Sequence, residues 1–206
     1  IKGRIKSIGN TRKITRAMEL VSAAKMRRAV ISALQSRAYA QVAMEIAGRL
    51  APKVDPHIHP MLHPHEGATR IGVVVISSNR GLAGAFSSNV VNIALNELKT
   101  KKDAEFITLG RRGADALRRA RGVIVADFAK VDLARSVTEV RPLVKLVRDG
   151  FIAGRYREVR VVYTKYVSAL VQKAEVITLL PFGTLGLTDS PTNYKLQATS
   201  SSADEY

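Results

Sequence analysis

The sequence predicts an α/β protein in which one long helix precedes an open, mostly parallel sheet. Residues 1–51 contain no proline and space their apolar residues at helical intervals, whereas residues 70–181 alternate β-branched runs with helical patterns. Residues 52–69 between them carry four prolines, and the periodic pattern ends after residue 181. We therefore expect a coiled-coil shaft helix at 1–51, a linker at 52–69, an α/β domain at 70–181 and a second linker at 182–206.

The apolar residues of the first segment predict a coiled-coil seam. From residue 14 onward their spacing is mostly three and four, and the step from Ile8 to Ile14 breaks the phase. At about 1.5 Å per residue, 50 residues would form a rod of roughly 75 Å. Such a helix needs a partner helix, and the sequence contains no second long helix to supply one. The expected seam consists of Ile14, Val21, Ala24, Ile31, Leu34, Ala38 and Val42.

Positive charge is concentrated on this helix. The chain has 206 residues and a formal net charge of +16, and residues 1–50 hold eleven basic residues and only two acidic ones. Such an excess predicts an anionic or acid-rich partner. Nucleic acid could be bound through its phosphates, but the helix has no aromatic residue before Tyr39 on which a base could stack. A solvated basic face on a coiled-coil strand explains the charge at least as well.

The second segment alternates strand and helix patterns, which is typical of an open, Rossmann-like sheet. The last two strands have a short connection, which leaves an antiparallel edge hairpin and a mixed sheet open. The expected strands are Ile71–Ile76, Glu105–Leu109, Val123–Ala126, Glu158–Tyr166 and Glu175–Leu180. The expected helices are Phe86–Lys99, a helix after Gly113 that includes Ala120, and one that a capping box at Ser136–Glu139 opens and that runs toward Phe151.

Composition excludes several classes of protein. The sequence has no cysteine, which rules out disulfide scaffolds, thiol catalysis and cysteine-held metal centres. Apolar runs such as Ile71–Ile76 are far shorter than the roughly 20 residues that span a bilayer. The opening residues have no apolar signal core. We therefore expect a soluble protein that is not exported.

The turn after the first expected strand is the only candidate phosphate loop. It reads Ser77-Ser-Asn-Arg-Gly-Leu-Ala-Gly84, with G-x-x-G spacing that matches neither the dinucleotide fingerprint nor the P-loop. Its glycines can equally serve only to permit a tight turn. A nucleotide-binding α/β enzyme is therefore kept as a second hypothesis. No G-x-S-x-G elbow is present, and Asp127 and Asp132 are interpreted as solvated or helix-capping. We therefore expect no active site and no cofactor.

All four histidines lie in the proline-rich linker, at His57, His59, His63 and His65. Imidazoles this close could hold zinc or nickel. No carboxylate or cysteine on regular structure accompanies them, and the neighbouring prolines restrict their geometry. An exposed, pH-sensitive loop without a defined site is the simpler interpretation.

Several motifs resemble the gamma subunit of F-type ATP synthase. The most specific lies in the first helix, where more than twenty residues match between Arg4 and Ala29. The resemblance covers essentially the whole chain in order, and its family-signature turn contributes Arg80, Gly81 and Gly84. The motifs are Arg4–Ile8, Asn10–Ala29, Ser77–Gly84, Ser88–Asn89, Val161–Tyr166, Ser168, Gln172 and Leu179–Pro181.

The resemblance implies a rotor shaft without catalytic residues or cofactors. In that family two long helices form a coiled coil inside a ring of alpha and beta subunits, and an α/β domain meets the epsilon subunit and the membrane-embedded c ring. Proton flow turns this shaft, present in one copy per complex, and the ring makes ATP. By motif match, the contacts with the alpha/beta ring would be Lys13, Arg16, Met18, Glu19, Lys25, Arg27 and Arg28.

Two departures from the family pattern shape the remaining expectations. The family's C-terminal helix is absent from this sequence, so we expect the chain alone to aggregate or fray along its seam. The regulatory thiol pair of the chloroplast form is also absent. This favours a peripheral protein on the cytoplasmic face of a bacterial plasma membrane, with the matrix side of the mitochondrial inner membrane as the alternative. A nucleotide-binding protein and a basic coiled-coil nucleic-acid binder remain as other hypotheses.

Overall fold

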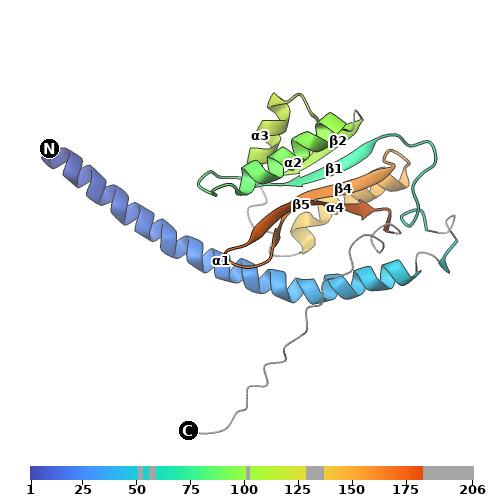
Figure 1. Cartoon of the computed structure of the whole chain (residues 1–206), viewed down its shortest axis with the longest axis horizontal. Helices are drawn as coiled ribbons and strands as arrows, with labels where there is room; N and C mark the ends of the chain where they lie inside the picture. Colours follow the sequence, from blue (N-terminus) through green and yellow to red (C-terminus); the bar gives the residue numbers. More distant parts are fainter. Residues whose placement is uncertain (51–52, 56–58, 101–102, 129–136, 183–206) are drawn as a thin grey trace, which may run out of the picture. The chain divides into compact units, whose positions relative to one another are not determined.

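The computed structural model describes residues 1–50, 53–55, 59–100, 103–128 and 137–182. The chain divides into two compact units, Ile1–Ile46 and Ala47–Tyr206, and each is described by itself (Figure 1). The predicted linker at 182–206 lies outside the described residues except for Phe182, and so do Asp132, Ser136 and His57.

The first unit belongs to a single helix, α1, that spans Lys2–Leu50. No proline interrupts it, and three of its hydroxyl side chains donate to carbonyl oxygens of the preceding turn. The Thr11 and Thr15 hydroxyls donate to carbonyl oxygens four residues earlier at 3.1 Å, and the Ser36 hydroxyl does so at 2.8 Å. The predicted long helix is confirmed.

The second unit contains a five-stranded sheet flanked by three helices (Figure 1). β1 and β4 have the bounds that the sequence predicts, and the other elements differ by a few residues at their ends. In chain order they are β1 (Ile71–Ile76), α2 (Phe86–Thr100), β2 (Ala104–Leu109), α3 (Arg111–Arg119), β3 (Val123–Asp127), α4 (Val137–Ile152), β4 (Glu158–Tyr166) and β5 (Gln172–Leu180).

The strand order is β3-β2-β1-β4-β5. β1 lies at the centre and pairs in parallel with β2 on one side and with β4 on the other. β5 pairs with β4 in the antiparallel direction, so the sheet is mixed and the edge hairpin that the sequence left open is present. From β1 the chain continues to β2 and β3 on one side of β1, and it later returns to the opposite side of β1 at β4. The boundary between β1 and β4 is therefore the topological switch point.

Two apolar clusters cover the two faces of the sheet, which explains why β1 is apolar throughout. Val73 and Val75 face the first cluster with Val90 of α2 and Leu117 of α3. Val74 faces the second cluster, to which α4 contributes Val147 and Phe151. Figure 1 shows α2 and α3 on one face of the sheet and α4 on the other.

Two element boundaries differ from the sequence prediction for physical reasons. α3 begins at Arg111 and ends at Arg119, so Ala120 is its C-cap and not a helical residue. β5 begins at Gln172, three residues earlier than predicted, because Gln172 and Lys173 pair with the end of β4. Because these side chains are polar, the sequence pattern does not show that the strand extends this far. β5 lies at the edge of the sheet, where one side of the backbone has no neighbouring strand.

The described part of the segment before β1 packs onto the domain. Met61 packs against the second cluster, and its carbonyl oxygen accepts the Phe182 amide at 2.9 Å. The His65 ring lies 5.2 Å from the Phe151 ring, centroid to centroid. This segment therefore links the C-terminal end of α4 to the chain that follows β5.

Candidate functional site

Helix α1 exposes its predicted seam. None of its 49 residues, all of which the structure describes, is buried. Ile14 is 60% exposed, and Leu34 and Val42 are 51% and 56% exposed. A fully buried aliphatic side chain contributes about 1.5–3 kcal/mol relative to an exposed one, so this helix leaves a large hydrophobic contribution unrealised. The seam is therefore an exposed apolar surface in the described structure.

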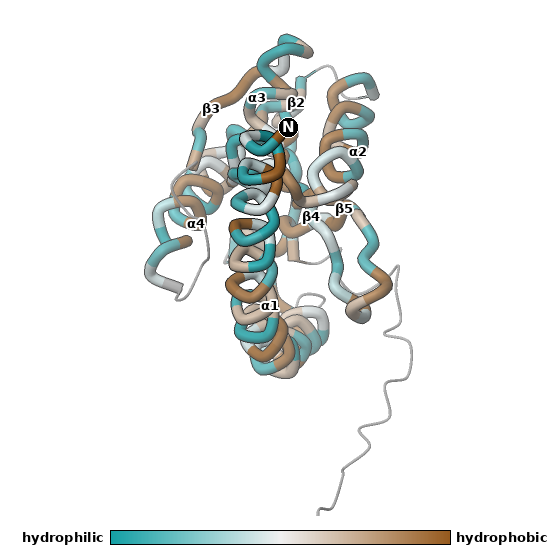
Figure 2. The backbone as a smooth tube through the Cα atoms, turned by 90° about the vertical axis from the view of Figure 1, so that its left-hand side faces the viewer, coloured by the Kyte–Doolittle hydropathy of each residue, from teal (hydrophilic) through white to brown (hydrophobic). Residues whose placement is uncertain are grey.

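The apolar residues of α1 are not confined to the seam. Ile8, Met26 and Met44 are also exposed, and they follow one another at intervals of 18 residues, which is about five whole helical turns. Met26 follows Ala24 by two residues, or about 200° around the helix, so this second line lies opposite the seam. Figure 2 shows apolar and polar residues mixed along the whole of α1. One partner helix could not cover both sides.

The predicted ring-contact residues all lie on the surface of α1. They occupy residues 13–28, a length of roughly 24 Å along the helix axis, and every one is exposed. The structure does not gather them into one patch, because at about 100° per residue their side chains leave the helix in directions all around its axis. They are Lys13, Arg16, Met18, Glu19, Lys25, Arg27 and Arg28.

The family-signature turn follows β1 and adopts strained backbone. Leu82 has φ +61° and is 94% exposed, and Gly84 has φ +54°. A leucine held in the left-handed region and in water is unfavourable on both counts. The Ser78 hydroxyl steadies the turn by donating to the Arg80 carbonyl oxygen at 2.8 Å, and the Arg112 guanidinium lies against Gly81.

This turn occupies the first amides of α3. The Arg111 amide donates to Asn79 Oδ1 at 3.0 Å, the Arg112 amide to the Ser78 carbonyl at 3.0 Å, and the Gly113 amide to Ser77 Oγ at 2.8 Å. The turn therefore serves as a helix cap for α3, assembled from residues that are distant in the sequence.

Asp127 is exposed, as the sequence suggested, but its carboxylate has partners rather than standing free. Its Oδ2 pairs with Arg118 Nη2 at 2.7 Å, and its Oδ1 accepts the Thr108 hydroxyl at 2.9 Å. These contacts join the end of β3 to α3 and β2. Neither of the two described hollows is lined by these residues.

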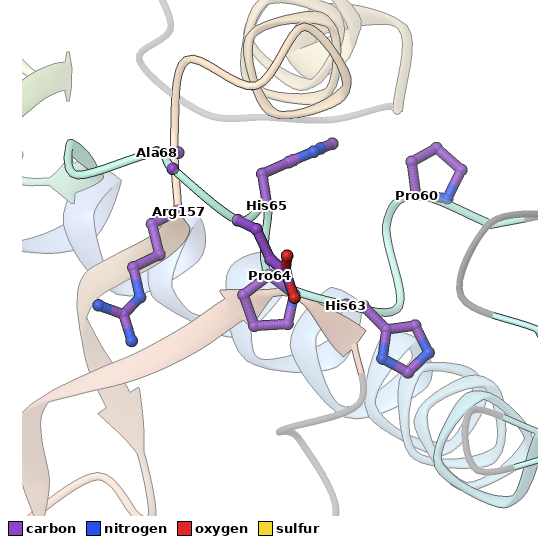
Figure 3. A pocket seen from close by; sticks show the side chains of 8 residues that line it. Pro60, His63, Pro64, His65, Ala68 and Arg157 are labelled. Atoms are coloured by element: carbon purple, nitrogen blue, oxygen red, sulfur yellow. The ribbon is translucent and has the colours of Figure 1, made fainter.

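The histidine segment lines a hollow of about 840 Å³ with Arg157 (Figure 3). His63 and His65 are half-buried rather than exposed, and their Nε2 atoms lack a partner within the described structure. Figure 3 shows His63, His65 and Arg157 pointing in different directions. No group of three or more His, Cys, Asp or Glu suited to a metal occurs in the described residues, which do not include His57. The metal-site expectation gains no support from this geometry.

A charged cluster that sequence reasoning missed lies where β1, β2 and β4 begin. Glu105 Oε1 accepts Arg70 Nη1 at 3.0 Å, and its Oε2 accepts Arg155 Nε at 2.8 Å. Burial alone would raise the pKa of Glu105, but hydrogen bonds from Arg155 and Tyr156 and the two positive charges lower it. Burial and the neighbouring carboxylate raise the pKa of Tyr156 to about 12. The three strand ends are thereby fixed together, and only the fold brings these residues into contact.

Gamma chains of ATP synthase resemble this chain in sequence. Gamma chains of ATP synthase from Stenotrophomonas maltophilia strain K279a and Roseiflexus castenholzii are each 36% identical to this chain, over 185 and 186 residues. Each match covers 88% of this chain and 64% of the relative, so the chain spans somewhat less than two thirds of the curated relatives.

Structural comparison supports the same fold. The central stalk and c-ring structure of Tetrahymena thermophila mitochondrial ATP synthase contains a chain that matches with a TM-score of 0.55 at 22% identity, covering 82% of this chain and 72% of that one. Within the described residues, no helix is long and apolar enough to cross a membrane. A family model described as ATP synthase matches residues 1–206. The chain therefore belongs to the ATP synthase family.

Proposed function

We propose that this chain is the central-stalk rotor subunit of a proton-translocating F-type ATP synthase. In this role it transmits torque between the membrane c ring and the alpha/beta ring during ATP synthesis, and it carries no catalytic residue of its own. The observation that carries the proposal is α1, a 49-residue helix with no buried residue and with apolar side chains on opposite sides. A shaft packed against a second helix and enclosed by a ring would have both sides covered.

The charge of α1 supports the same role. Its eleven basic and two acidic residues attract acidic surfaces over a Debye length of about 8–10 Å without requiring one fixed geometry. A shaft that turns inside a ring needs contacts of this kind. We place the ring contacts at Lys13, Arg16, Met18, Glu19, Lys25, Arg27 and Arg28, and the helix-to-helix contact along the seam.

The α/β domain would serve as the foot that meets the epsilon subunit and the c ring. Its signature turn has G-x-x-G spacing and lacks an intact phosphate motif, so the fold can serve as a docking body. We place the chain, in one copy per complex, at the periphery of a membrane. The cytoplasmic face of a bacterial plasma membrane is the favoured site, and no nucleic acid is involved.

The mass of the native complex tests the subunit assignment. The full-length protein would be tagged in its host, and the complex isolated from gently solubilised membranes. One copy with three alpha and three beta subunits is the expected composition. Recovery of the protein alone, or with nucleic acid, would refute the proposal.

Disulfide crosslinking tests the torque role. The sequence has no cysteine, so a single introduced thiol is unique within this chain. Arg28→Cys on α1 would be combined with a cysteine introduced into the beta subunit. Oxidation to the disulfide should stop ATP hydrolysis, and reduction of that disulfide should restore it. Lys145→Cys on exposed α4 is the matched control. Continued turnover in a fully crosslinked complex would contradict a turning shaft.

A further inference from the structure

Helix α3 carries a dense group of arginines on its exposed side. Residues 111–121 contain five arginines and one aspartate, which gives this stretch a net charge of +4. The helix buries Gly113, Ala114 and Leu117, whereas every arginine of the group is exposed. Figure 1 shows α3 beside α2 on one face of the sheet, and the whole group belongs to the second compact unit. Its members are Arg111, Arg112, Arg118, Arg119 and Arg121.

The first two arginines oppose the stability of α3 itself. A helix favours acidic residues in its first turn, yet α3 begins with Arg111 and Arg112 and has no acidic residue there. Gly113 also lowers the helix propensity, but a Cβ at this position would lie 2.8 Å from Ser77 Oγ, so close packing accounts for the glycine. Charges that break a local rule of helix stability are expected at functional surfaces.

The arginines of α3 form two rows along the helix. Arg111 and Arg118 are seven residues apart, and so are Arg112 and Arg119. Because seven residues make almost two full turns, the members of each pair leave the helix in nearly the same direction, about 10.5 Å apart along its axis. A partner helix that places charged residues seven positions apart has the same spacing.

Carboxylates neutralise one of these rows in part. Arg118 Nη1 lies 3.3 Å from Asp115 Oδ1, and its Nη2 lies 2.7 Å from Asp127 Oδ2. Arg111 Nε lies 3.7 Å from Asp115 Oδ2. The second row has no ion pair within the part of the chain that the structure describes. Its charge therefore remains available for carboxylates of another chain.

The exposed side of α3 favours protein carboxylates over a phosphate surface. The planar guanidinium group can bind a carboxylate through two hydrogen bonds. Asp115 and Asp127 lie among the arginines and would repel the closely spaced phosphates of a nucleic acid or an anionic membrane. No large apolar residue of α3 is exposed to enter a membrane. We propose that the two arginine rows of α3 dock an acidic helix of a partner protein whose carboxylates recur at seven-residue intervals.

Two peptides of equal composition, both constrained as helices, test the spacing. One carries two glutamate pairs seven residues apart on one side, and the other distributes the same glutamates around the helix. In methyl NMR of the full-length protein, the first peptide should shift Ala116 and Ala120 in a saturable way, with an affinity at least about threefold higher than the second. Ala174 on β5, at the opposite edge of the sheet from β3, should not move. Equal affinities, or no saturable shifts, would overturn the proposal.

Substitution of one arginine tests the electrostatic contact. Arg119→Gln should weaken binding of the first peptide about two- to fivefold and leave the Tm unchanged, because this exposed side chain has no ion pair among the described residues. Arg141→Gln on α4, which lies on the other face of the sheet, is the matched control and should not change binding. Unchanged binding in Arg119→Gln, or an equal loss in both variants, would contradict the docking surface.

Phosphate-bearing competitors test the choice of partner. A short DNA duplex and soluble dihexanoyl phosphatidylglycerol would each be added to the protein with the first peptide bound. At an equal concentration of negative charge, neither should reverse the shifts of Ala116 and Ala120. Reversal by either competitor would identify a phosphate-binding surface and would overturn the assignment to an acidic helix.

Discussion

Helix α1 and the α/β domain use apolar residues in opposite ways. The domain buries its large side chains completely, as Phe106, Leu117 and Phe151 show with no exposed surface. Along α1, residues of the same kind remain about half exposed, and none is buried. The domain therefore buries its apolar residues within the described structure, whereas the seam of α1 is left exposed.

The largest expected effect comes from separating the two regions. Deletion of residues 1–46 should leave the domain folded, with one cooperative thermal transition and the near-ultraviolet circular dichroism of packed aromatic rings. The reason is that both apolar clusters consist of residues from 61 onward. Loss of the cooperative transition would show that the domain relies on α1.

Matched core truncations sharpen the same contrast. Phe106→Ala should reduce the free energy of unfolding by about 3–5 kcal/mol, because it opens a cavity in the first cluster. Ile31→Ala on exposed α1 should change it by less than about 0.5 kcal/mol in the isolated chain. Urea denaturation would measure both values. Similar losses for the two variants would contradict the division into a self-sufficient domain and a dependent helix.

Gly110 follows the carboxyl end of β2, and its packing there can be tested by comparison with Gly154, which precedes β4. Gly110 has φ +110°, and a Cβ there would collide with the Ser77 backbone. Gly154 has φ +72° with open space around it. Gly110→Ala should therefore destabilise the domain by at least about 2 kcal/mol, and Gly154→Ala by about 1 kcal/mol. Equal Tm values for the two variants would show that the signature turn yields to the added methyl group.

The smallest effect concerns the charged cluster at the opposite edge of the sheet. Because the folded protein holds the pKa of Glu105 below its ordinary value of 4.5, the carboxylate contributes stability above pH 4.5. That contribution should disappear as the pH falls through the lowered value. Glu105→Gln should reduce stability at pH 7 by less than about 2 kcal/mol and flatten its decline in acid. An unchanged acid profile in this variant would contradict the assigned role.

Much of the fold could be predicted because many of its elements carry a hydrophobic pattern within their own residues. The β-branched run of β1 and the bounds of β4 follow from sequence patterns, and α1 follows from its unbroken helical spacing. The start of α3 could not be predicted, since its cap comes from Asn79, 32 residues earlier. The early start of β5 was hidden because polar residues can pair at a sheet edge.

The candidate sites were only partly accessible to sequence reasoning. The seam and the basic residues of α1 are visible as patterns, and their contacts remain predictions because the described structure contains no partner for them. The Glu105 cluster depends on strands that meet only in the folded domain. The sequence signal for the cluster was Glu105, a charged residue at the start of an otherwise apolar expected strand.

Hydrogen exchange along α1 tests the central claim most directly. Backbone amides of residues 14–42 would be compared in the isolated chain and in the assembled ATP synthase complex. The account predicts rapid exchange in the isolated chain and strong protection in the complex, because partners supply the burial that α1 lacks. Equal and strong protection in both states would show that α1 is stable by itself and would contradict its role as a shaft sheathed by other subunits.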